Sequence, residues 1–212
     1  MIAKKQGETS YKQTAFGVIP RSKLIPLEIE GIKRAWDFVL QKHSKGVILI
    51  TPTFIQKIHA IGFKWIFPKI GGRFRVIDVT VSDYAPPKFY LVPSLMADFC
   101  QDIKVRLVYL PNIDNSEFLN KIIEFLAWMH HKFLWIHPFQ DYNGRIGRLL
   151  INIILLNLNL PPIELKVETK ESRKKYVKAL QEADKNNFKS LEKIIKLAIK
   201  ETAKELLEEN KK

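Results

Sequence analysis

The sequence contains very little cysteine and no long apolar run. Its 212 residues include one cysteine, Cys100, which excludes an intramolecular disulfide and favours a reducing compartment. We expect Cys100 to be a small buried apolar residue. No apolar segment typical of a secretory signal follows the N-terminal lysines. The most apolar stretch, residues 151–156, is too short to cross a bilayer. These absences predict a soluble, cytoplasmic protein without a membrane partner.

Internal repeats, low-complexity segments and interdomain linkers are also absent. With 46% hydrophobic and 27% charged residues, the composition is typical of a globular protein. The length suits one domain with a good core. Residues 1–21 are polar and lack apolar periodicity, so we expect a flexible N-terminal arm followed by a single domain over residues 22–212.

The net charge of +13 permits two interpretations. A basic protein can bind a polyanion such as nucleic acid. However, the positive charges are spread along the chain, and the densest cluster falls on what we expect to be a solvated helix face: Lys170, Arg173, Lys174, Lys175 and Lys178. We prefer a role in solubility, so nucleic acid is not the expected partner.

Apolar periodicity predicts a mainly α-helical domain with a small β-hairpin. Thr51-Pro52 has the pattern of a helix start, with an N-cap followed by proline. Alternating apolar residues predict two short strands, separated by the turn at Pro86-Pro87. The helices are expected over residues 27–40, 52–65, 93–103, 118–136, 145–156, 170–183 and 191–207, and the strands over residues 73–81 and 88–92.

The stretch from His137 to Arg148 joins two apolar helices. Pro138 keeps His137 out of the α region, so the preceding helix should end just before it. Asn143-Gly144 is a turn signal, after which a helix resumes. The stretch is therefore a helix–loop–helix joint, and it reads His-Pro-Phe-Gln-Asp-Tyr-Asn-Gly-Arg-Ile-Gly-Arg.

The start of the second helix suits a phosphate group. A helix N-terminus offers free N–H groups and the positive end of the dipole. Asn143 and Gly144 stand where a side-chain amide and an open backbone can surround an anion. Arg145 and Arg148 are neighbours on the helix surface, and their forks match phosphate oxygens. Cations at this end oppose the dipole, which favours a bound anion.

Two further residues of the loop suit catalysis. Asp141 is a ligand of the kind that Mg²⁺ prefers. The unperturbed pKa of His137 lies near neutrality, which makes it the candidate general base. Taken singly, each residue also fits a structural role, such as a solvated arginine or a packed histidine. Together they predict a phosphoryl- or nucleotidyl-transfer site.

The joint resembles the motif of the Fic domains of the Fic/Doc superfamily, H-x-F-x-[DE]-[AG]-N-G-R-x-x-R. Seven positions match it: His137, Phe139, Asp141, Asn143, Gly144, Arg145 and Arg148. Tyr142 departs from the motif, because the family usually has a small residue there. If the backbone needs a conformation open mainly to glycine, Tyr142 introduces strain. Alternatively, its ring stacks on the nucleotide or contacts the target.

The resemblance implies a Fic-like helical bundle, with a core over about residues 50–200 and a β-hairpin flap. Residues 72–75 resemble the family's glycine-x-aromatic-arginine stretch before the flap. Residues 80–92 would form the flap, which pairs with an extended segment of the target protein. An ordinary hairpin covering the core is the alternative. The expected target contacts are Thr80, Val81, Phe89, Tyr90 and Leu91.

The implied activity is that of a protein adenylyltransferase. Such an enzyme transfers AMP from ATP, with Mg²⁺, to a Ser, Thr or Tyr hydroxyl of a target protein. By the resemblance, His137 is the general base, Asp141 holds Mg²⁺ and Phe139 anchors the loop. The expected phosphate-binding residues are Asn143, Gly144, Arg145 and Arg148.

The resemblance also raises the question of inhibition. Many Fic proteins carry an inhibitory helix with the pattern [ST]-x-x-x-E-[GN], whose glutamate pairs with the second motif arginine. Here Glu30 precedes Gly31 within a predicted helix at about residues 27–43, but Pro26 replaces the Ser or Thr. A Glu30–Arg148 ion pair is the inhibitory hypothesis. An exposed glutamate at a helix start, favoured by the dipole, is the alternative.

Other functions stay open at this point. In the family the same glutamate can support removal of AMP. A kinase-like or phosphocholine transfer uses the same scaffold, although Gly144 favours the nucleotidyl form over a variant with lysine there. A non-enzymatic, nucleic-acid-binding protein is suggested by charge alone. An antitoxin partner or a homo-oligomer is compatible with the resemblance.

Overall fold

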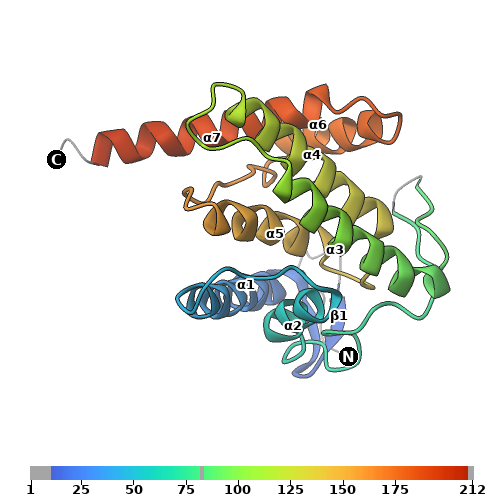
Figure 1. Ribbon diagram of the computed structural model, residues 1–212. Helices are drawn as coiled ribbons and strands as arrows, with labels where there is room; N and C mark the ends of the chain where they lie inside the picture. Colours follow the sequence, from blue (N-terminus) through green and yellow to red (C-terminus); the bar gives the residue numbers. More distant parts are fainter. Residues whose placement is uncertain (1–10, 82–83, 210–212) are drawn as a thin grey trace.

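The structure is a computed structural model that describes residues 11–81 and 84–209. Helices dominate it, and a two-stranded antiparallel hairpin lies at its N-terminal end (Figure 1). The elements are β1 (Tyr11–Thr14), β2 (Gly17–Pro20), α1 (Arg21–His43), α2 (Pro52–Phe63), the one-turn 3₁₀ helix η1 (Phe89–Leu91), α3 (Val92–Val108), α4 (Phe118–Ile136), α5 (Asn143–Asn157), α6 (Lys170–Ala183) and α7 (Lys189–Glu209).

Local signals fix several helix starts. Thr51 accepts a hydrogen bond from the N–H of Phe54 at 3.1 Å, and Pro52 is the first residue of α2. This satisfies one of the free N–H groups of the first turn. Thr169 caps α6 in the same way through the N–H of Ser172, at 3.1 Å. The predicted start of α2 and both ends of α6 are therefore confirmed.

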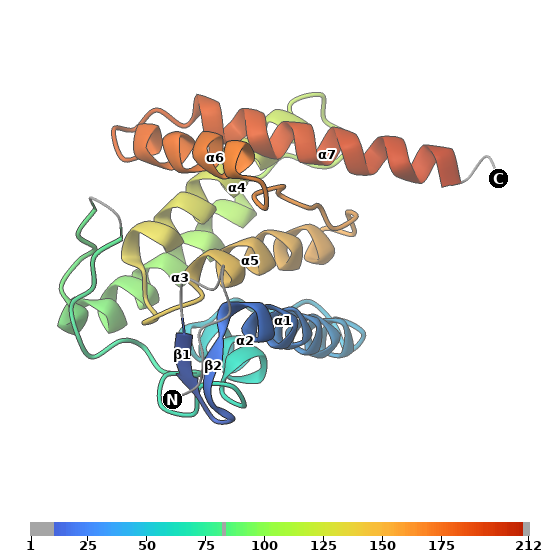
Figure 2. The ribbon, with the colours of Figure 1, turned by 180° about the vertical axis from the view of Figure 1, so that it is seen from behind.

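Helix α5 lies in the middle of the molecule. It contacts α1 and α2 on one side and α4 on the other, while α4 also contacts α3 and α7 (Figures 1 and 2). Most of its residues are buried, as expected of a helix that is apolar nearly all round. Because α5 begins at Asn143, the joint between α4 and α5 is positioned by the best-packed part of the fold.

Helices α1 and α2 cross at a pair of glycines. A Cβ added to Gly31 would lie 2.1 Å from the carbonyl oxygen of Gly62, so no larger residue fits without separating the helices. Gly31 therefore has a packing role. The contact fixes the distance between the axes of α1 and α2 at their crossing point.

The N-terminal segment differs from the expected flexible arm. Residues 11–20 form the β1–β2 hairpin, and residues 1–10 of the predicted arm lie outside the described residues. Gly17, with φ of 87°, completes the turn between the strands. The hairpin is held to the body by the N–H of Ala15, which donates to the carbonyl of Ile66 at 2.8 Å. This distant partner explains why a local pattern did not reveal the hairpin.

Helix α1 also begins earlier than expected, at Arg21, and continues through Pro26. Proline inside a helix removes one backbone hydrogen bond, which is why the sequence favoured a start after it. Arg21 donates to the carboxylate of Glu28 at 2.6 Å and ties the first turns together across the proline.

The two strands expected over residues 73–81 and 88–92 are absent from the described residues. This segment is a loop with one isolated antiparallel bridge, between Val81 and Tyr84, followed by η1. The buried guanidinium of Arg75 donates to the carbonyls of Ile77, at 3.1 Å, and Pro87. These backbone groups are thus satisfied without strand pairing. The fold class, mainly α with a small hairpin, is confirmed, but the hairpin lies at residues 11–20.

No helix in the described part of the chain is long and apolar enough to cross a membrane.

Candidate active site

His137 forms the C-cap of α4 in a left-handed conformation, with φ of 50°. Its N–H donates to the carbonyl of Phe133 at 3.0 Å, and Pro138 follows, so the helix ends where the sequence predicts. Arg75 holds this backbone from the neighbouring loop. Its Nε donates to the carbonyl of His137 at 2.8 Å, and its N–H donates to the carbonyl of Pro138 at 2.9 Å.

The imidazole of His137 has the state that a general base needs. Its Nδ1 lies 3.3 Å from the carbonyl oxygen of Leu134, which can only accept, so Nδ1 carries the proton and Nε2 keeps a free lone pair. Burial lowers the pKa of His137 below its ordinary value, and the hydrogen bond to Leu134 opposes this. The ring is therefore neutral at pH 7.

The loop after His137 is stiffened by Asn143, whose side chain is buried. Its amide donates to the carbonyl of Phe139 at 2.8 Å and accepts from the N–H of Phe139 at 2.9 Å. Both halves of the amide are therefore occupied. Asn143 thus closes the loop on itself, and the predicted contact of its side chain with phosphate stays a prediction.

Asp141 projects from the loop and is partly exposed. One carboxylate oxygen accepts from the N–H of Tyr142 at 2.7 Å, and the other pairs with the ammonium of Lys12 on β1. Its carbonyl accepts from Nε2 of His59 at 3.2 Å. The Nδ1 of His59 accepts from the N–H of Gly72 at 2.8 Å, so this buried histidine joins two loops.

The surroundings of Asp141 suit Mg²⁺ only together with a bound phosphate group. Within the described residues there is no group of three or more His, Cys, Asp or Glu side chains that could hold a metal. A cation at Asp141 would thus rely on water and on the oxygens of a bound phosphate, which is a common arrangement for Mg²⁺. The residues present fit a nucleotide-bound Mg²⁺ and not a protein-enclosed metal.

The start of α5 is open to an anion. Asn143 and Gly144 are its first residues, and their N–H groups precede the helical hydrogen-bond ladder. A Cβ on Gly144 would meet only Nη1 of Arg148, at 3.6 Å. The missing side chain and the arginine therefore lie together at this end. The charge of Arg148 acts on Tyr176 of α6, whose pKa it lowers against the effect of burial, and the hydroxyl of Tyr176 is 2.5 Å from Nε2 of the buried His130.

Arg145 is held by a residue that the sequence did not single out. Its Nη2 donates to Glu28 of α1 at 2.5 Å, and the carboxylate of Glu28 is fully buried. Nη1 of Arg145 is also buried and has no acceptor among the described residues. A buried guanidinium nitrogen without an acceptor is costly and suits a site that binds an anion.

Tyr142, the residue that departs from the motif, is accommodated by its contacts with the core. It lies in the left-handed region, with φ of 67°, which a bulky residue rarely adopts. Its ring stacks on Phe63 with 4.0 Å between centroids, and its hydroxyl donates to Glu28 at 2.8 Å. Burial and the bond to Glu28 raise the pKa of Tyr142. The ring is packed in the core, so it is not available to stack on a nucleotide.

Glu30 does not form the expected ion pair with Arg148. It is exposed and pairs with Arg34 on its own helix, with 2.9 Å between the carboxylate and Nε. Two positions along a helix correspond to a turn of about 200°, so Glu28 and Glu30 face opposite sides. The glutamate that faces the motif is Glu28. An inhibitory role of Glu30 stays a prediction without this contact behind it.

Some of these residues had a signal in the sequence and others had none. Glu28 lies on the buried stripe of α1, where an ionisable residue is unusual. That stripe is Leu24, Glu28, Gly31, Ala35 and Val39. Arg75 belongs to the recognised glycine-x-aromatic-arginine stretch, but its clamp on His137 was not foreseen. Lys12 gave no signal, because its position depends on the hairpin.

The expected target-contact residues lie on the loop beside His137. Their side chains are exposed, and the loop is joined to the end of α4 by the hydroxyl of Tyr84, which donates to the carbonyl of Trp135 at 3.0 Å. The loop thus carries an exposed apolar surface near the candidate base. The residues concerned are Thr80, Val81, Phe89, Tyr90 and Leu91.

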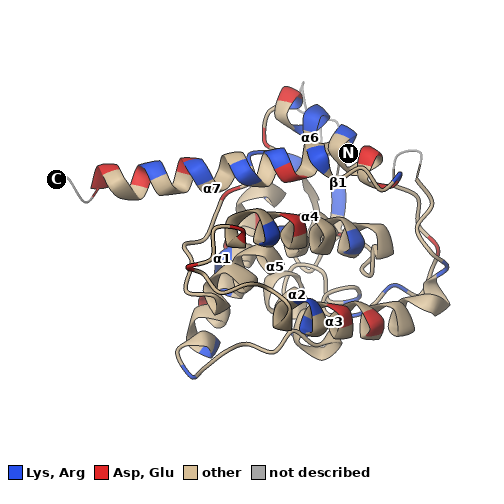
Figure 3. Cartoon of the chain, turned by 45° about the horizontal axis from the view of Figure 1, so that its top comes forward, with Lys and Arg blue, Asp and Glu red and all other residues tan. Residues whose placement is uncertain are grey.

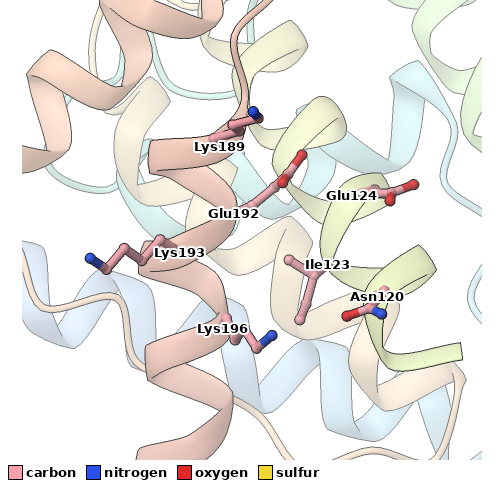
Figure 4. A pocket seen from close by; sticks show the side chains of 7 residues that line it. All are labelled: Asn120, Ile123, Glu124, Lys189, Glu192, Lys193 and Lys196. Carbon is pink, nitrogen blue, oxygen red and sulfur yellow. The ribbon is translucent and has the colours of Figure 1, made fainter. Parts of the chain in front are cut away.

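A pocket between α4 and α7 lies apart from this site. Figure 4 shows lysines and a glutamate of α7 facing Glu124 and two uncharged residues of α4 around it, and none of the motif residues. Basic and acidic residues also alternate along α7 (Figure 3), where Lys204 pairs with Glu208, and α6 has a similar pair, Lys175–Glu171. Charges of both signs are thus interspersed along these two helices.

Comparison with known proteins agrees with this geometry. The model of the Fic/DOC family matches residues 49–155. A relative from Nematostella vectensis, named "Protein adenylyltransferase Fic", is 30% identical over 83% of this chain and 39% of its own length. A relative of the same name from Aedes aegypti is 29% identical over 79% of this chain and 31% of its own length. The chain thus spans less than half the length of these relatives.

Solved structures share the fold. Fic-1 from C. elegans has a TM-score of 0.65 at 24% identity, over 87% of this chain and 51% of that one. The BepC protein of Bartonella tribocorum, solved with bound AMPPNP, has a TM-score of 0.66 at 14% identity, over 92% of this chain and 94% of that one. With half of its sequence matched by the family model and the motif residues gathered at one helix start, the chain belongs to the Fic/DOC family.

Proposed function

We propose that this protein is an adenylyltransferase that moves AMP from ATP to a hydroxyl group of a target protein. The observation that carries the proposal is the neutral His137, whose free Nε2 lies in the loop that leads into the N-terminus of α5 and its two arginines. The curated relatives are named for this activity, and BepC was solved with an ATP analogue. Both facts support ATP as the substrate.

The reaction follows from the roles of the side chains. Nε2 of His137 takes the proton of the target hydroxyl as its oxygen attacks the α-phosphorus of ATP. The new O–P bond forms, the bond from that phosphorus to the β-phosphate oxygen breaks, and pyrophosphate leaves. Arg145, Arg148 and the first N–H groups of α5 stabilise the negative charge. Asp141 is the residue that would hold Mg²⁺, which supplies further positive charge when bound.

The loop described over residues 76–81 and 84–91 is the proposed docking site for the target. Its exposed apolar side chains lie on a segment that Arg75 fastens to the backbone of His137. An extended target segment lying along this loop would bring its hydroxyl to the base. The isolated bridge at Val81 leaves more backbone free for such pairing than a complete hairpin would.

Mass spectrometry after incubation with ATP and Mg²⁺ tests the activity. The protein itself and a cell lysate serve as acceptors, since the target is unknown. We expect a mass gain of one AMP, lost in His137→Ala. His43→Ala is the matched control, because His43 lies in the last turn of α1, and it should label like the wild type. A gain of one phosphate, or undiminished labelling in His137→Ala, would refute the proposal.

A further inference from the structure

A buried carboxylate on α1 collects hydrogen bonds from three different parts of the chain. Glu28 is fully buried and accepts from Arg21 at 2.6 Å, from the hydroxyl of Tyr142 at 2.8 Å and from Arg145 at 2.5 Å. It lies outside the 49–155 range that the family model matches. Two of its three partners belong to the motif loop and to the first turn of α5.

We propose that Glu28 is a positioning residue, which orients Arg145 and holds the motif loop in the shape that binds the phosphates of ATP. The inference rests on the proposed function, since it assigns Arg145 to those phosphates. Glu28 touches neither the substrate nor the reacting atoms. It acts through Arg145 and Tyr142.

The effect on Arg145 is one of orientation. Glu28 binds Nη2, which leaves Nη1 as the donor without an acceptor among the described residues. The side chain is therefore held by one arm of its fork, and the other arm is left for an anion. A long flexible side chain that is already fixed loses less entropy when the ligand binds.

The effect on Tyr142 concerns the backbone. A tyrosine at φ of 67° is strained, whereas a glycine would adopt this conformation freely. The stacking on Phe63 and the hydrogen bond to Glu28 hold the tyrosine in place. Because Tyr142 immediately precedes α5, its conformation decides where Asn143 and Gly144 direct their N–H groups. Glu28 therefore helps Tyr142 to keep a left-handed backbone conformation that a glycine would adopt without strain.

A competing interpretation predicts the opposite change in nucleotide affinity when Glu28 is replaced. If Glu28 neutralised Arg145 and withheld it from the phosphates, its removal would strengthen nucleotide binding. If Glu28 positions Arg145, its removal weakens binding, because the guanidinium loses its fixed direction and the loop loses one hydrogen bond. The direction of the change thus decides between positioning and competition.

Isothermal titration with AMPPNP and Mg²⁺ measures that direction. Glu28→Gln keeps the size of the side chain and removes its charge. We expect its affinity for AMPPNP to fall by about tenfold to a hundredfold, the usual effect of losing a hydrogen bond to a charged group. Asp37→Asn, which removes an exposed carboxylate from the same helix, is the matched control and should bind like the wild type. Equal or tighter binding by Glu28→Gln would overturn the inference.

A second variant keeps the test decisive if Glu28→Gln folds poorly. Tyr142→Phe removes only the hydroxyl, and we expect weaker AMPPNP binding and a raised KM for ATP. The double variant should lose less affinity than the sum of the two single losses, because the residues act as one unit. Wild-type affinity in Tyr142→Phe, or strictly additive losses, would contradict the inference. A wild-type protein that binds no AMPPNP would instead refute the proposed function, and the inference with it.

Discussion

The ion pair between Lys12 and Asp141 makes a quantitative prediction about metal binding. Asp141 is the residue proposed to hold Mg²⁺, and in the structure its carboxylate already has a cation beside it. The ammonium of Lys12 also lies 5.5 Å from the ring centre of Tyr142 and 5.9 Å from that of Phe67. A divalent cation at Asp141 therefore competes with Lys12. Lys12→Met removes the charge and keeps a chain of similar length.

The size of the effect follows from the exposure of the two side chains. Lys12 is 42% exposed and Asp141 is 40% exposed. Ion pairs of this exposure contribute about 0.2 to 1 kcal/mol, because water and salt screen them. Binding of a cation that must first displace Lys12 is weakened by that amount. Lys12→Met should therefore bind the divalent cation about 1.4-fold to 5-fold more tightly.

The assay is a titration with Mn²⁺ followed by electron paramagnetic resonance, at saturating AMPPNP. Mn²⁺ stands in for Mg²⁺ because both prefer oxygen ligands. Lys166→Met is the control, since Lys166 forms a similar surface pair with Glu201, at 2.9 Å, away from the motif. The gain should shrink as sodium chloride is raised towards 1 M, where screening is strong. Unchanged or weaker Mn²⁺ binding in Lys12→Met would refute the competition.

Three further predictions concern stability and pH. Burial lowers the pKa of His59 to about 4 and that of His130 to about 3, so the unfolded chain takes up protons first as the pH falls below about 6.5. The free energy of unfolding should drop by about 2 kcal/mol per histidine from pH 8 to pH 5, and urea denaturation curves that coincide at the two pH values would contradict this. Asn143→Ala should lower the free energy of unfolding by about 1 to 3 kcal/mol, because it leaves the backbone of Phe139 unpaired, and an unchanged urea midpoint would disprove that role. The lowered pKa of His137 predicts a labelling rate that is flat from about pH 7 to 9 and falls in acid, whereas a rate that falls with rising pH would rule His137 out as the base.

The motif loop could be predicted from the sequence because its signals are local. Pro138 ends α4, Asn143-Gly144 opens α5, and Thr51-Pro52 starts α2 as expected. These residues restrict the backbone or satisfy N–H groups through neighbours a few positions away. Such effects need no knowledge of the rest of the fold.

The features that the sequence did not reveal depend on partners far away along the chain or on which face of a helix is buried. The sequence pattern pointed to Glu30 because a glycine follows it, whereas the carboxylate that contacts the motif belongs to Glu28, on the opposite face of α1. The buried stripe of α1, which includes Gly31, contains the information, but Pro26 obscured where the helix begins. The hairpin of residues 11–20 and the clamp by Arg75 rest on contacts with segments about 50 and 60 residues away.

The glycine contact between α1 and α2 ties helix packing to the chemistry of the site. Gly31 lies three residues after Glu28 on the same side of α1, and its backbone rests against Gly62. A substitution that shifts α1 relative to α2 would therefore also disturb the position of the Glu28 carboxylate that binds Arg145 on α5. Under the proposed function, the strength of phosphate binding would then depend on a helix spacing set by two residues with no side chain. If the proposed function holds, a substitution at either glycine changes the site without touching a charged or nucleophilic residue.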